Sequence, residues 1–337
     1  MKQKPRIWLA GNIIVDIVKT VDCYPEKGML ANISSVSQAV GGCVPNTAID
    51  LAKIDPELPL GVIGKVGQDA YGSYVVNKME QYGIDTHCVT VCQNAPTSFS
   101  DVMSQPNGER TFFHARGANA CFSPEDVALE TLEGSILHAG YIMLLDRFDE
   151  EDAQYGTVMA RFLKQAQDRG FKTSVDAVSD STSNYQKKVL PALKYCHYVI
   201  INEIESCGIF GLSPRNEDGS LNEKAVQEAM RRMAEVGVKE KIIVHSKEAG
   251  FCLDVATGVF TRVNSLRIPA EQIAGSVGAG DAFCAGCLYG LYHGYTDGDI
   301  LSFASAAAAC NLFAENSVDG MKQKEEIWEM AKNWPRQ

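Results

Sequence analysis

The 337-residue sequence has little positive charge. It holds 31 Lys and Arg residues against 42 Asp and Glu residues, so its formal net charge is -11 at pH 7. Nucleic acids and anionic membranes attract proteins through a basic face, and the composition argues against both as partners. A hydrophobic content of 45% is ordinary for a globular protein. The length is enough for one large α/β domain or two moderate ones.

Long hydrophobic runs are also missing. The longest stretch of small and apolar residues, Ser302 to Ala314, is too short to cross a bilayer. The opening MKQKPRIWLAG holds no long apolar segment that ends in a cleavage site, so we expect no secretory signal. These absences predict a cytoplasmic protein.

Two common nucleotide-binding motifs are absent as well. The pattern G-x-x-x-x-G-K-[ST] does not occur, which argues against a Walker-type NTPase. The first predicted strand, Ile7–Ala10, is followed by Gly-Asn-Ile-Ile and not by G-x-G-x-x-G. A dinucleotide-dependent dehydrogenase is therefore disfavoured.

Paired cysteine motifs are scarce although the chain has 11 cysteines. Cys284 and Cys287 have the C-x-x-C spacing, but no second pair completes a zinc site of the common kind. Free Cys is often buried, so we interpret this pair as core packing in a reduced compartment.

Apolar strand-like runs alternate with helical patterns along most of the chain. The predicted strands are Ile7–Ala10, Leu60–Val66, Ile136–Leu144, Lys172–Asp176, Tyr198–Ile201 and Lys241–His245. The predicted helices are Asn46–Ile54, Ala70–Tyr82, Glu151–Gln167, Glu223–Val236, Asp281–Tyr292, Gly298–Ala314 and Lys324–Lys332. This alternation predicts an α/β fold with a doubly wound, largely parallel sheet flanked by helices.

Two stretches, 14–40 and 97–116, contain β-rich runs with no helix between them. In the second stretch, Asn107-Gly108 is typical of a hairpin turn between Ser98–Ser104 and Arg110–Ala115. We predict that both stretches form one small β-sheet, a lid inserted into a core of residues 1–13, 41–96 and 117–337. Two separate surface hairpins are the alternative.

The glycine-rich run Gly275 to Asp281 precedes a predicted helix. A helix start exposes unpaired N–H groups and the positive end of the helix dipole, so it favours an anion such as phosphate. Asp281 lies in the first turn, where the dipole and the N–H groups favour its ionised form. The run is consistent with phosphoryl transfer to a hydroxyl, and the alternative is a simple helix cap.

Four motifs occur in order along nearly the whole chain. They are Gly11-Asn12 with Asp16, Gly41-Gly42 with Asn46, Asn202-Glu203-Ile204-Glu205, and Gly278-Ala279-Gly280-Asp281. In these motifs the chain resembles the ribokinase/PfkB family of carbohydrate kinases. The resemblance implies an α/β core with a β lid, ATP and Mg²⁺ as cofactors, and transfer of the γ-phosphoryl group to a sugar or nucleoside hydroxyl.

The resemblance also implies roles for individual residues. Asp281 is the expected general base, and the amides from Gly278 through Ala279 and Gly280 are expected to hold the transferred phosphoryl group. Contacts to the sugar are expected from Asp16, Gly41, Gly42 and Asn46. Asp146 follows a predicted strand and could touch a sugar hydroxyl or could be an exposed loop acid. The candidates for binding ATP are Asn202, Glu205, Ser246, Lys247, Gly250, Gly278 and Gly280. Glu205 is expected to hold Mg²⁺ through water.

The chain departs from the family at several positions. The last motif commonly opens with Asp-Thr, but here it opens with Gly275-Ser276, which puts a monovalent-cation site in doubt. Ile14 and Cys43 stand where ribokinases carry Asn and Lys, which weakens a ribose-specific assignment. Arg110 and Arg116 could clamp a phosphorylated sugar or could be solvated edge-strand charges.

The sequence therefore predicts an ATP-dependent kinase for a fructose-like or ribose-like sugar. Two alternatives stay open: a nucleoside kinase similar to adenosine kinases, and a sugar sensor that has kept the fold without catalysis. Because the exposed edges of a lid sheet invite pairing with a second copy, we also expect a homodimer through the lid.

Overall fold

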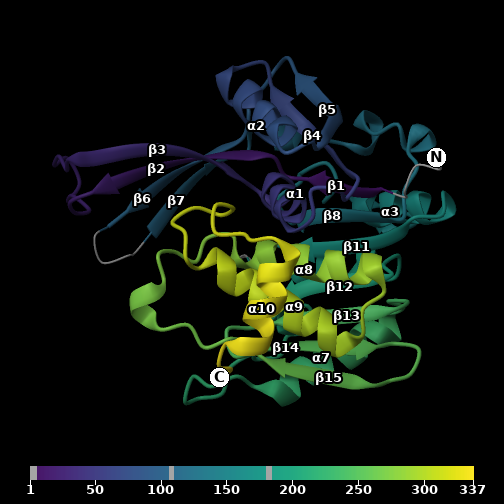
Figure 1. Ribbon diagram of the computed structural model, residues 1–337. Coiled ribbons are helices and arrows are strands. Elements are labelled where there is room, and N and C mark those ends of the chain that lie inside the picture. The colour runs from purple at the N-terminus through teal and green to yellow at the C-terminus, as the bar shows by residue number, and fades with distance from the viewer. Residues whose placement is uncertain (1–5, 106–109, 180–183) are drawn as a thin grey trace.

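The computed structural model describes residues 6–105, 110–179 and 184–337 (Figure 1). Its main sheet has nine strands in the order β15-β14-β13-β12-β11-β8-β1-β4-β5. Neighbouring strands are parallel except that β14 runs antiparallel to β13 and β15. The strands are β1 (Ile7–Gly11), β4 (Leu60–Gly67), β5 (Asp85–Cys92), β8 (Ile136–Ile142), β11 (Lys172–Ala177), β12 (Tyr198–Asn202), β13 (Lys241–His245), β14 (Ala249–Asp254) and β15 (Phe260–Asn264).

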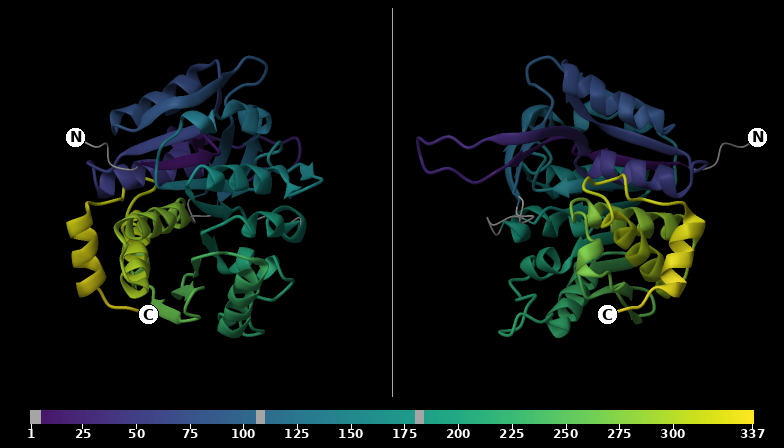
Figure 2. Two further views of the ribbon diagram at one scale, coloured as in Figure 1. Left: turned by 90° about the vertical axis from the view of Figure 1, so that its right-hand side faces the viewer. Right: turned by 60° about the vertical axis from the view of Figure 1, so that its left-hand side comes forward.

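Helices cover both faces of this sheet, as Figure 2 shows. Side chains alternate along β1, so Ile7 and Leu9 join one buried core while Trp8 and Ala10 join the other. The first core lies under α1 (Cys43–Ile54), α2 (Ala70–Gln81), α8 (Ala279–His293), α9 (Asp297–Asn311) and α10 (Lys324–Asn333). The second lies under α3 (Val158–Asp168), α4 (Tyr185–Lys188), α5 (Leu190–Leu193), α6 (Glu203–Gly208) and α7 (Glu223–Val236). The doubly wound prediction is confirmed.

Short 3₁₀ turns lie in the connections between these elements. They are η1 (Gly117–Cys121), η2 (Pro124–Asp126), η3 (Leu129–Thr131) and η4 (Ala270–Gln272). Within the described residues, no helix has the length and apolar character needed to span a bilayer. Cys284 and Cys287 are both buried in α8.

The predicted helix over 151–167 begins too early. Residues 151–157 instead form a tight hairpin of β9 (Glu151–Asp152) and β10 (Gly156–Thr157). Asp152 Oδ1 accepts hydrogen bonds from the amides of Gln154 and Tyr155, a turn contact that competes with the helix. Thr157 then caps α3 by accepting from the amide of Ala160 at 3.2 Å.

A second sheet stands apart from the first and projects from it (Figure 1). Its strands are β2 (Ile14–Val21), β3 (Ile33–Gly41), β6 (Phe99–Ser104) and β7 (Arg110–Ala115), in the order β3-β2-β6-β7. The two β-rich stretches thus form one small sheet, because β2 pairs with β6 in parallel. The predicted turn at Asn107-Gly108 lies outside the described residues.

The strand order places a switch point between β1 and β8. From β1 the chain continues outward to β4 and β5, whereas from β8 it continues the other way to β11, β12 and β13. In open α/β sheets, ligands bind at the carboxyl ends of the strands beside such a point. Here those ends lie at Gly11, Ile142, Ala177, Asn202 and His245.

Candidate active site

The start of α8 forms an anion-binding cradle. Gly278 is the N-cap residue, with a left-handed φ of 79° and no side-chain cap. A Cβ on Gly278 would lie 2.4 Å from Ser317 Cβ, so both the turn and the packing require glycine. In the described part of the chain, the amides of Gly280 and Asp281 donate no hydrogen bond. These N–H groups are available to an anion.

Two hydrogen bonds fix the Asp281 carboxylate, which is 5% exposed. Tyr141 donates its hydroxyl to Oδ1 at 2.6 Å, and Asn46 donates Nδ2 to Oδ2 at 2.8 Å. Ser317 Oγ in turn donates to Asn46 Oδ1 at 2.9 Å, which sets the orientation of the Asn46 amide. Asn46 lies inside α1 and is not a helix cap. The structure brings it to Asp281, and its contact with substrate stays a prediction.

Burial raises the pKa of Asp281 from 3.8 to about 6. The nearby Asp176 carboxylate raises this pKa further, while the hydrogen bonds from Tyr141 and Asn46 lower it. The contacts at the helix start do not keep this pKa low, because the desolvation cost exceeds their effect. Asp281 is nevertheless mostly ionised at neutral pH.

A cavity of about 280 Å³ opens beside Asp281. Its walls come from the carboxyl ends of four parallel strands and from the start of α8. The lining includes Tyr141, Asp176, Ser179, Asn202, Glu205, His245, Gly278, Gly280, Asp281 and Cys284. The structure therefore brings the predicted residues Asn202, Glu205, Gly278, Gly280 and Asp281 together around one cavity.

Asn202 and Glu205 form a capping box at the start of α6. Glu205 Oε1 accepts from Asn202 Nδ2 at 2.8 Å and from Ser179 Oγ at 2.9 Å, and Oε2 accepts from the Asn202 amide at 3.0 Å. Burial raises the pKa of Glu205 to about 8. A cation held near this carboxyl group through water would favour its ionised form and offset the cost of burial.

A second, more apolar cavity of about 480 Å³ lies on the other side of the cradle. Its apolar lining consists of Leu266, Ile268, Ile273, Ala279, Phe283, Ala308, Ala309 and Leu312. Gly280 and His245 line both cavities, so the two meet at the start of α8. Burial lowers the pKa of His245 to about 4, and its neutral ring packs 4.7 Å from that of Phe283. This space suits an aromatic base next to phosphate groups.

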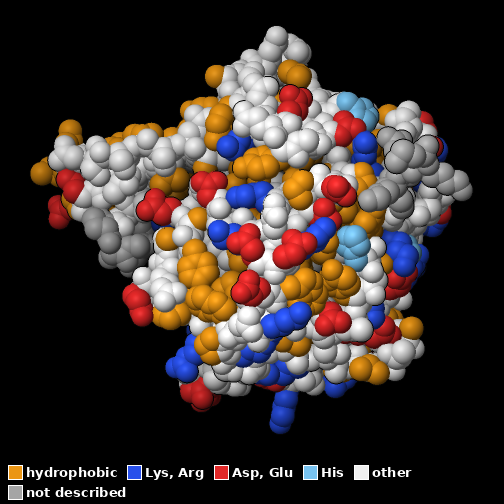
Figure 3. Space-filling model, viewed as in Figure 1, with side chains coloured by type: hydrophobic (Ala, Val, Ile, Leu, Met, Phe, Trp, Pro, Cys, Tyr) orange, Lys and Arg blue, Asp and Glu red, His pale blue; other side chains and the backbone are white. Residues whose placement is uncertain are grey.

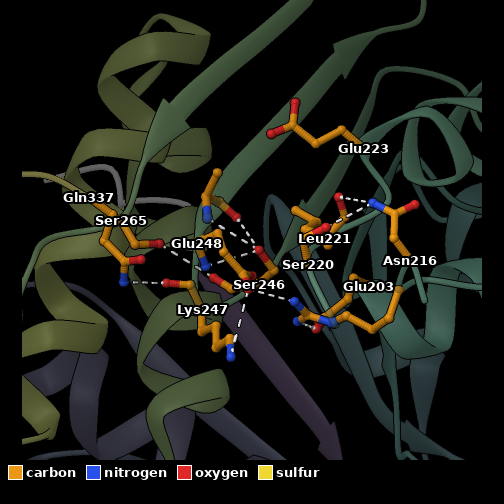
Figure 4. Close-up of polar contacts among 12 residues, drawn as sticks. Glu203, Asn216, Ser220, Leu221, Glu223, Ser246, Lys247, Glu248, Ser265 and Gln337 are labelled. Carbon is orange, nitrogen blue, oxygen red and sulfur yellow. Dashed lines mark hydrogen bonds and ion pairs between the residues drawn. The ribbon is translucent and has the colours of Figure 1, made fainter. Parts of the chain in front are cut away.

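Ser246 and Lys247 also line the second cavity, in the turn between β13 and β14 (Figure 4). Ser246 Oγ accepts from the amides of Glu248 and Ala249, each at 3.2 Å. The Lys247 carbonyl accepts from Gln337 Nε2 at 2.9 Å. Gly250, the third residue predicted here, does not line the cavity: it lies in β14 under Phe283, where any Cβ would crowd that ring.

Asp16 lies on β2 opposite the end of β3. A Cβ on Gly41 would be 2.4 Å from Asp16 Oδ2, so glycine leaves the space that this carboxylate occupies. Gly42 has φ 84°, and a Cβ there would lie 2.6 Å from the Asn12 carbonyl. Burial raises the pKa of Asp16 to about 7, and the charge of Asp281 raises it further. This electrostatic effect means that the two carboxyl groups lie near each other.

Asp146, Arg110 and Arg116, the remaining candidates, lie outside the linings of both cavities. Asp146 accepts a hydrogen bond from Arg116 at 2.5 Å, and both side chains are substantially exposed. Arg110 donates to the Glu315 carbonyl at 3.3 Å and lowers the pKa of Asp16. A role of Asp146 in binding substrate stays a prediction.

Sequence reasoning missed Tyr141, Asp176 and the apolar lining of the second cavity. Asp176 could have been found, because it lies near the carboxyl end of a predicted parallel strand. The apolar lining comes from residues 266 to 312, in separate elements with no local motif.

Comparisons with known proteins agree with this geometry. A family described as "pfkB family carbohydrate kinase" matches residues 5–324. A ribokinase from Arabidopsis thaliana is 23% identical over 331 residues, which cover 97% of this chain and 81% of that protein. A 5-dehydro-2-deoxygluconokinase from Clostridium perfringens is 24% identical over 342 residues, covering 98% and 94% of the two chains.

Solved structures show the same fold. A ribokinase from Thermotoga maritima has a TM-score of 0.78 at 20% identity, with 98% of this chain and 100% of that chain covered. An Arabidopsis thaliana ribokinase complexed with ribose and ATP has a TM-score of 0.77 at 20% identity, with 98% and 99% covered. The ribokinase-like fold and the family resemblance are confirmed.

Proposed function

The chain belongs to the pfkB family of carbohydrate kinases, and we propose that it transfers the γ-phosphoryl group of ATP to a hydroxyl of a small sugar. One observation carries the proposal. A buried carboxylate, Asp281, lies in the first turn of α8, where available amides adjoin two connected cavities.

Asp281 acts as the general base in this proposal. Its pKa of about 6 leaves it ionised at neutral pH and able to accept a proton. Tyr141 and Asn46 hold its two oxygens in place. The amides of Gly280 and Asp281 stabilise the charge on the transferred group, a contribution that needs no reorganisation of the protein.

ATP fits with its base in the apolar cavity and its phosphates at the cradle. The donor set of Asn202 and Glu205 fits Mg²⁺ through water, since oxygen donors suit this hard cation. When bound, Mg²⁺ neutralises charge on the phosphates. A monovalent-cation requirement is not part of the proposal, because Gly275-Ser276 replaces the acid expected there.

The sugar lies between Asp281 and Asp16 in this proposal. Asp16 accepts hydrogen bonds from sugar hydroxyls, and Gly41 leaves room for the carboxylate and for close approach of the backbone. Residues 14–40 and 97–116 then act as a lid on a core formed by the remaining segments. This lid excludes water during transfer.

A panel of free sugars and nucleosides, assayed for ADP release, tests the proposed function. We expect turnover with a ketose or pentose and none with adenosine. Preferred turnover of a nucleoside would establish the nucleoside kinase alternative. Binding of a sugar without any ADP release would establish a sensor.

The pH dependence should report the Asp281 carboxyl group. At saturating sugar, where the ionisation of Asp16 does not limit binding, turnover is expected to rise with pH through about 6 and then to level, because the protonated Asp281 cannot accept the proton. Removing the Tyr141 hydroxyl in Tyr141→Phe takes away a hydrogen bond that favours the ionised form. A charged hydrogen bond of about 1.5 kcal/mol corresponds to roughly one pKa unit. The rising limb of the pH profile should therefore move to higher pH by roughly one unit.

Tyr289→Phe is the matched control for this pH profile. Its hydroxyl also donates to a carboxylate, Asp55 Oδ2, at 3.3 Å, and it lies on α8 outside the linings of both cavities. The rising limb of the Tyr289→Phe pH profile should stay at the wild-type pH. If the pH profile of Tyr141→Phe coincides with that of wild type, the group that titrates in the profile is not Asp281.

We also propose a homodimer through the small sheet. Both edge strands expose apolar side chains: Val36 on β3 is 63% exposed, and Phe112 on β7 is 53% exposed. Figure 3 shows hydrophobic side chains along the projecting β2–β3 arm. Exposed apolar side chains on the edge strands of a sheet favour pairing with a second copy, which supports the proposal.

Light scattering at micromolar concentration should give twice the chain mass of 36.7 kDa. The double change Val36→Asp with Phe112→Asp should give the single mass, while Val259→Asp, an exposed apolar residue before β15, should leave the dimer intact. A monomeric wild type would contradict the proposal.

A further inference from the structure

A cluster of three buried side chains lies at the wall of the 280 Å³ cavity, and the proposed phosphoryl transfer gives none of them a catalytic role. It consists of His138 from β8, Asp176 from β11 and Cys284 from α8. Their ligand atoms all lie within 4.8 Å of one another, and each side chain is almost fully buried. Asp176 and Cys284 line the cavity, which gives the cluster a route to solvent.

The distances within the cluster leave room for an ion between the side chains. His138 Nε2 lies 3.6 Å from Asp176 Oδ2 and 3.6 Å from Cys284 Sγ. Zinc binds such atoms at about 2.0–2.3 Å in a tetrahedron, which separates neighbouring donor atoms by about 3.3–3.8 Å. An N–H···O hydrogen bond is typically about 2.9 Å long. Both 3.6 Å spacings are compatible with ligands around one ion, and the contact between the thiol and the imidazole also allows a weak sulfur hydrogen bond when no ion is bound.

Asp176 supplies a second, independent observation. Its Oδ1 atom is buried and has no hydrogen-bond partner among the described residues. A buried carboxylate without enough partners is costly, and a cation beside it removes that cost. Neither Glu205 nor Asp281 shares this feature, since both of their oxygens accept hydrogen bonds.

Ser174 completes the arrangement behind the histidine. Its Oγ lies 2.9 Å from His138 Nδ1 on the side away from the cluster. When Nδ1 carries the proton and donates to Ser174, Nε2 presents its lone pair to the centre of the cluster. Metal-binding histidines are generally oriented by such a second contact.

We propose that His138, Asp176 and Cys284 bind one borderline-soft divalent transition-metal ion, Zn²⁺, with water from the cavity as the fourth ligand. Binding displaces the thiol proton of Cys284 to solvent, so that a thiolate coordinates the ion. Nitrogen and sulfur donors suit Zn²⁺ and its analogue Co²⁺ and do not suit Mg²⁺. This site is therefore chemically distinct from the Mg²⁺ position at Glu205.

Co²⁺ titration of chelator-treated wild-type protein tests the proposal without an activity assay. We expect one equivalent per chain, a visible spectrum typical of tetrahedral coordination, and a thiolate charge-transfer band that Zn²⁺ abolishes by displacement. Cys284→Ser should lose that band, and His138→Asn should weaken binding at least tenfold. Cys287→Ser is the matched control, because Cys287 is also buried in α8 but outside the cluster.

Anomalous scattering at the zinc edge from wild-type crystals locates the ion directly and does not depend on any variant folding. A peak bounded by the three side chains is the expected result. The proposal is overturned if micromolar Zn²⁺ gives no peak there, or if a folded Cys284→Ser protein, checked by circular dichroism, keeps the wild-type Co²⁺ spectrum.

Discussion

Asp281→Asn should lower the turnover number by about 10²–10⁴-fold, the usual contribution of a general base, while ATP still binds. Asn has nearly the same shape as Asp but cannot accept the proton of the attacking hydroxyl. Its side chain can still occupy the space between Tyr141 and Asn46, so the cradle amides stay in place. Steady-state kinetics gives the turnover number, and calorimetry with ATP gives the binding constant.

At alkaline pH, the Asp281→Asn protein should be at least as stable as the wild-type protein. The pKa of Asp281 is raised on folding from 3.8 to about 6, so the stability it contributes is complete below pH ~4 and is lost as pH rises through 6. Wild-type protein at pH 8 thus carries the cost of a buried charge that Asn does not carry. The melting temperature of Asp281→Asn relative to wild type should therefore increase from pH 5 to pH 8.

Asp168→Asn, an exposed acid at the end of α3, serves as the control for both measurements. It should keep wild-type turnover and show no pH-dependent gain in melting temperature. Retained turnover in Asp281→Asn would mean that the base lies elsewhere in the molecule.

Asp16→Asn should lower kcat/KM for the sugar by about 10–100-fold and leave the KM for ATP nearly unchanged. Hydrogen bonds to a charged group contribute about 1.5–3 kcal/mol, and 1.4 kcal/mol corresponds to a factor of ten. The effect should be confined to the sugar, because Asp16 lies on β2, away from the apolar cavity assigned to the base of ATP.

Asp101→Asn offers a matched comparison on the neighbouring strand β6. Asp101 forms an ion pair with Lys19 within the small sheet. Its replacement tests whether a lost charge in this sheet disturbs catalysis in general. Equal losses in Asp16→Asn and Asp101→Asn would show that the sheet was damaged and that Asp16 does not contact the sugar.

The α/β core was predictable because its signals are local. Glu223–Val236 and Lys241–His245 occur in the structure with the predicted bounds, since strong apolar periodicity coincides there with clear ends. The helix over 151–167 failed at its start, because a turn around Asp152 outweighed helix propensity. Hydrophobic periodicity does not reveal that a side chain can bond to the backbone of a turn in place of a helix.

The site was predictable where backbone geometry demands particular residues. Gly278 and Gly42 have left-handed backbone angles, so their identity is visible in the sequence. Contacts between distant elements leave no such trace. The bond from Tyr141 to Asp281 joins residues 140 positions apart, and its cause is the adjacency of β8 and α8 in the folded chain.

A crystal structure with a turned-over sugar and a non-hydrolysable ATP analogue most directly tests the central claim. The account predicts that the γ-phosphate analogue accepts hydrogen bonds from the amides of Gly280 and Asp281. It also predicts that one sugar hydroxyl lies about 2.6–3.2 Å from the Asp281 carboxylate. A γ-phosphate placed away from these amides, or a sugar with no hydroxyl near Asp281, would contradict it.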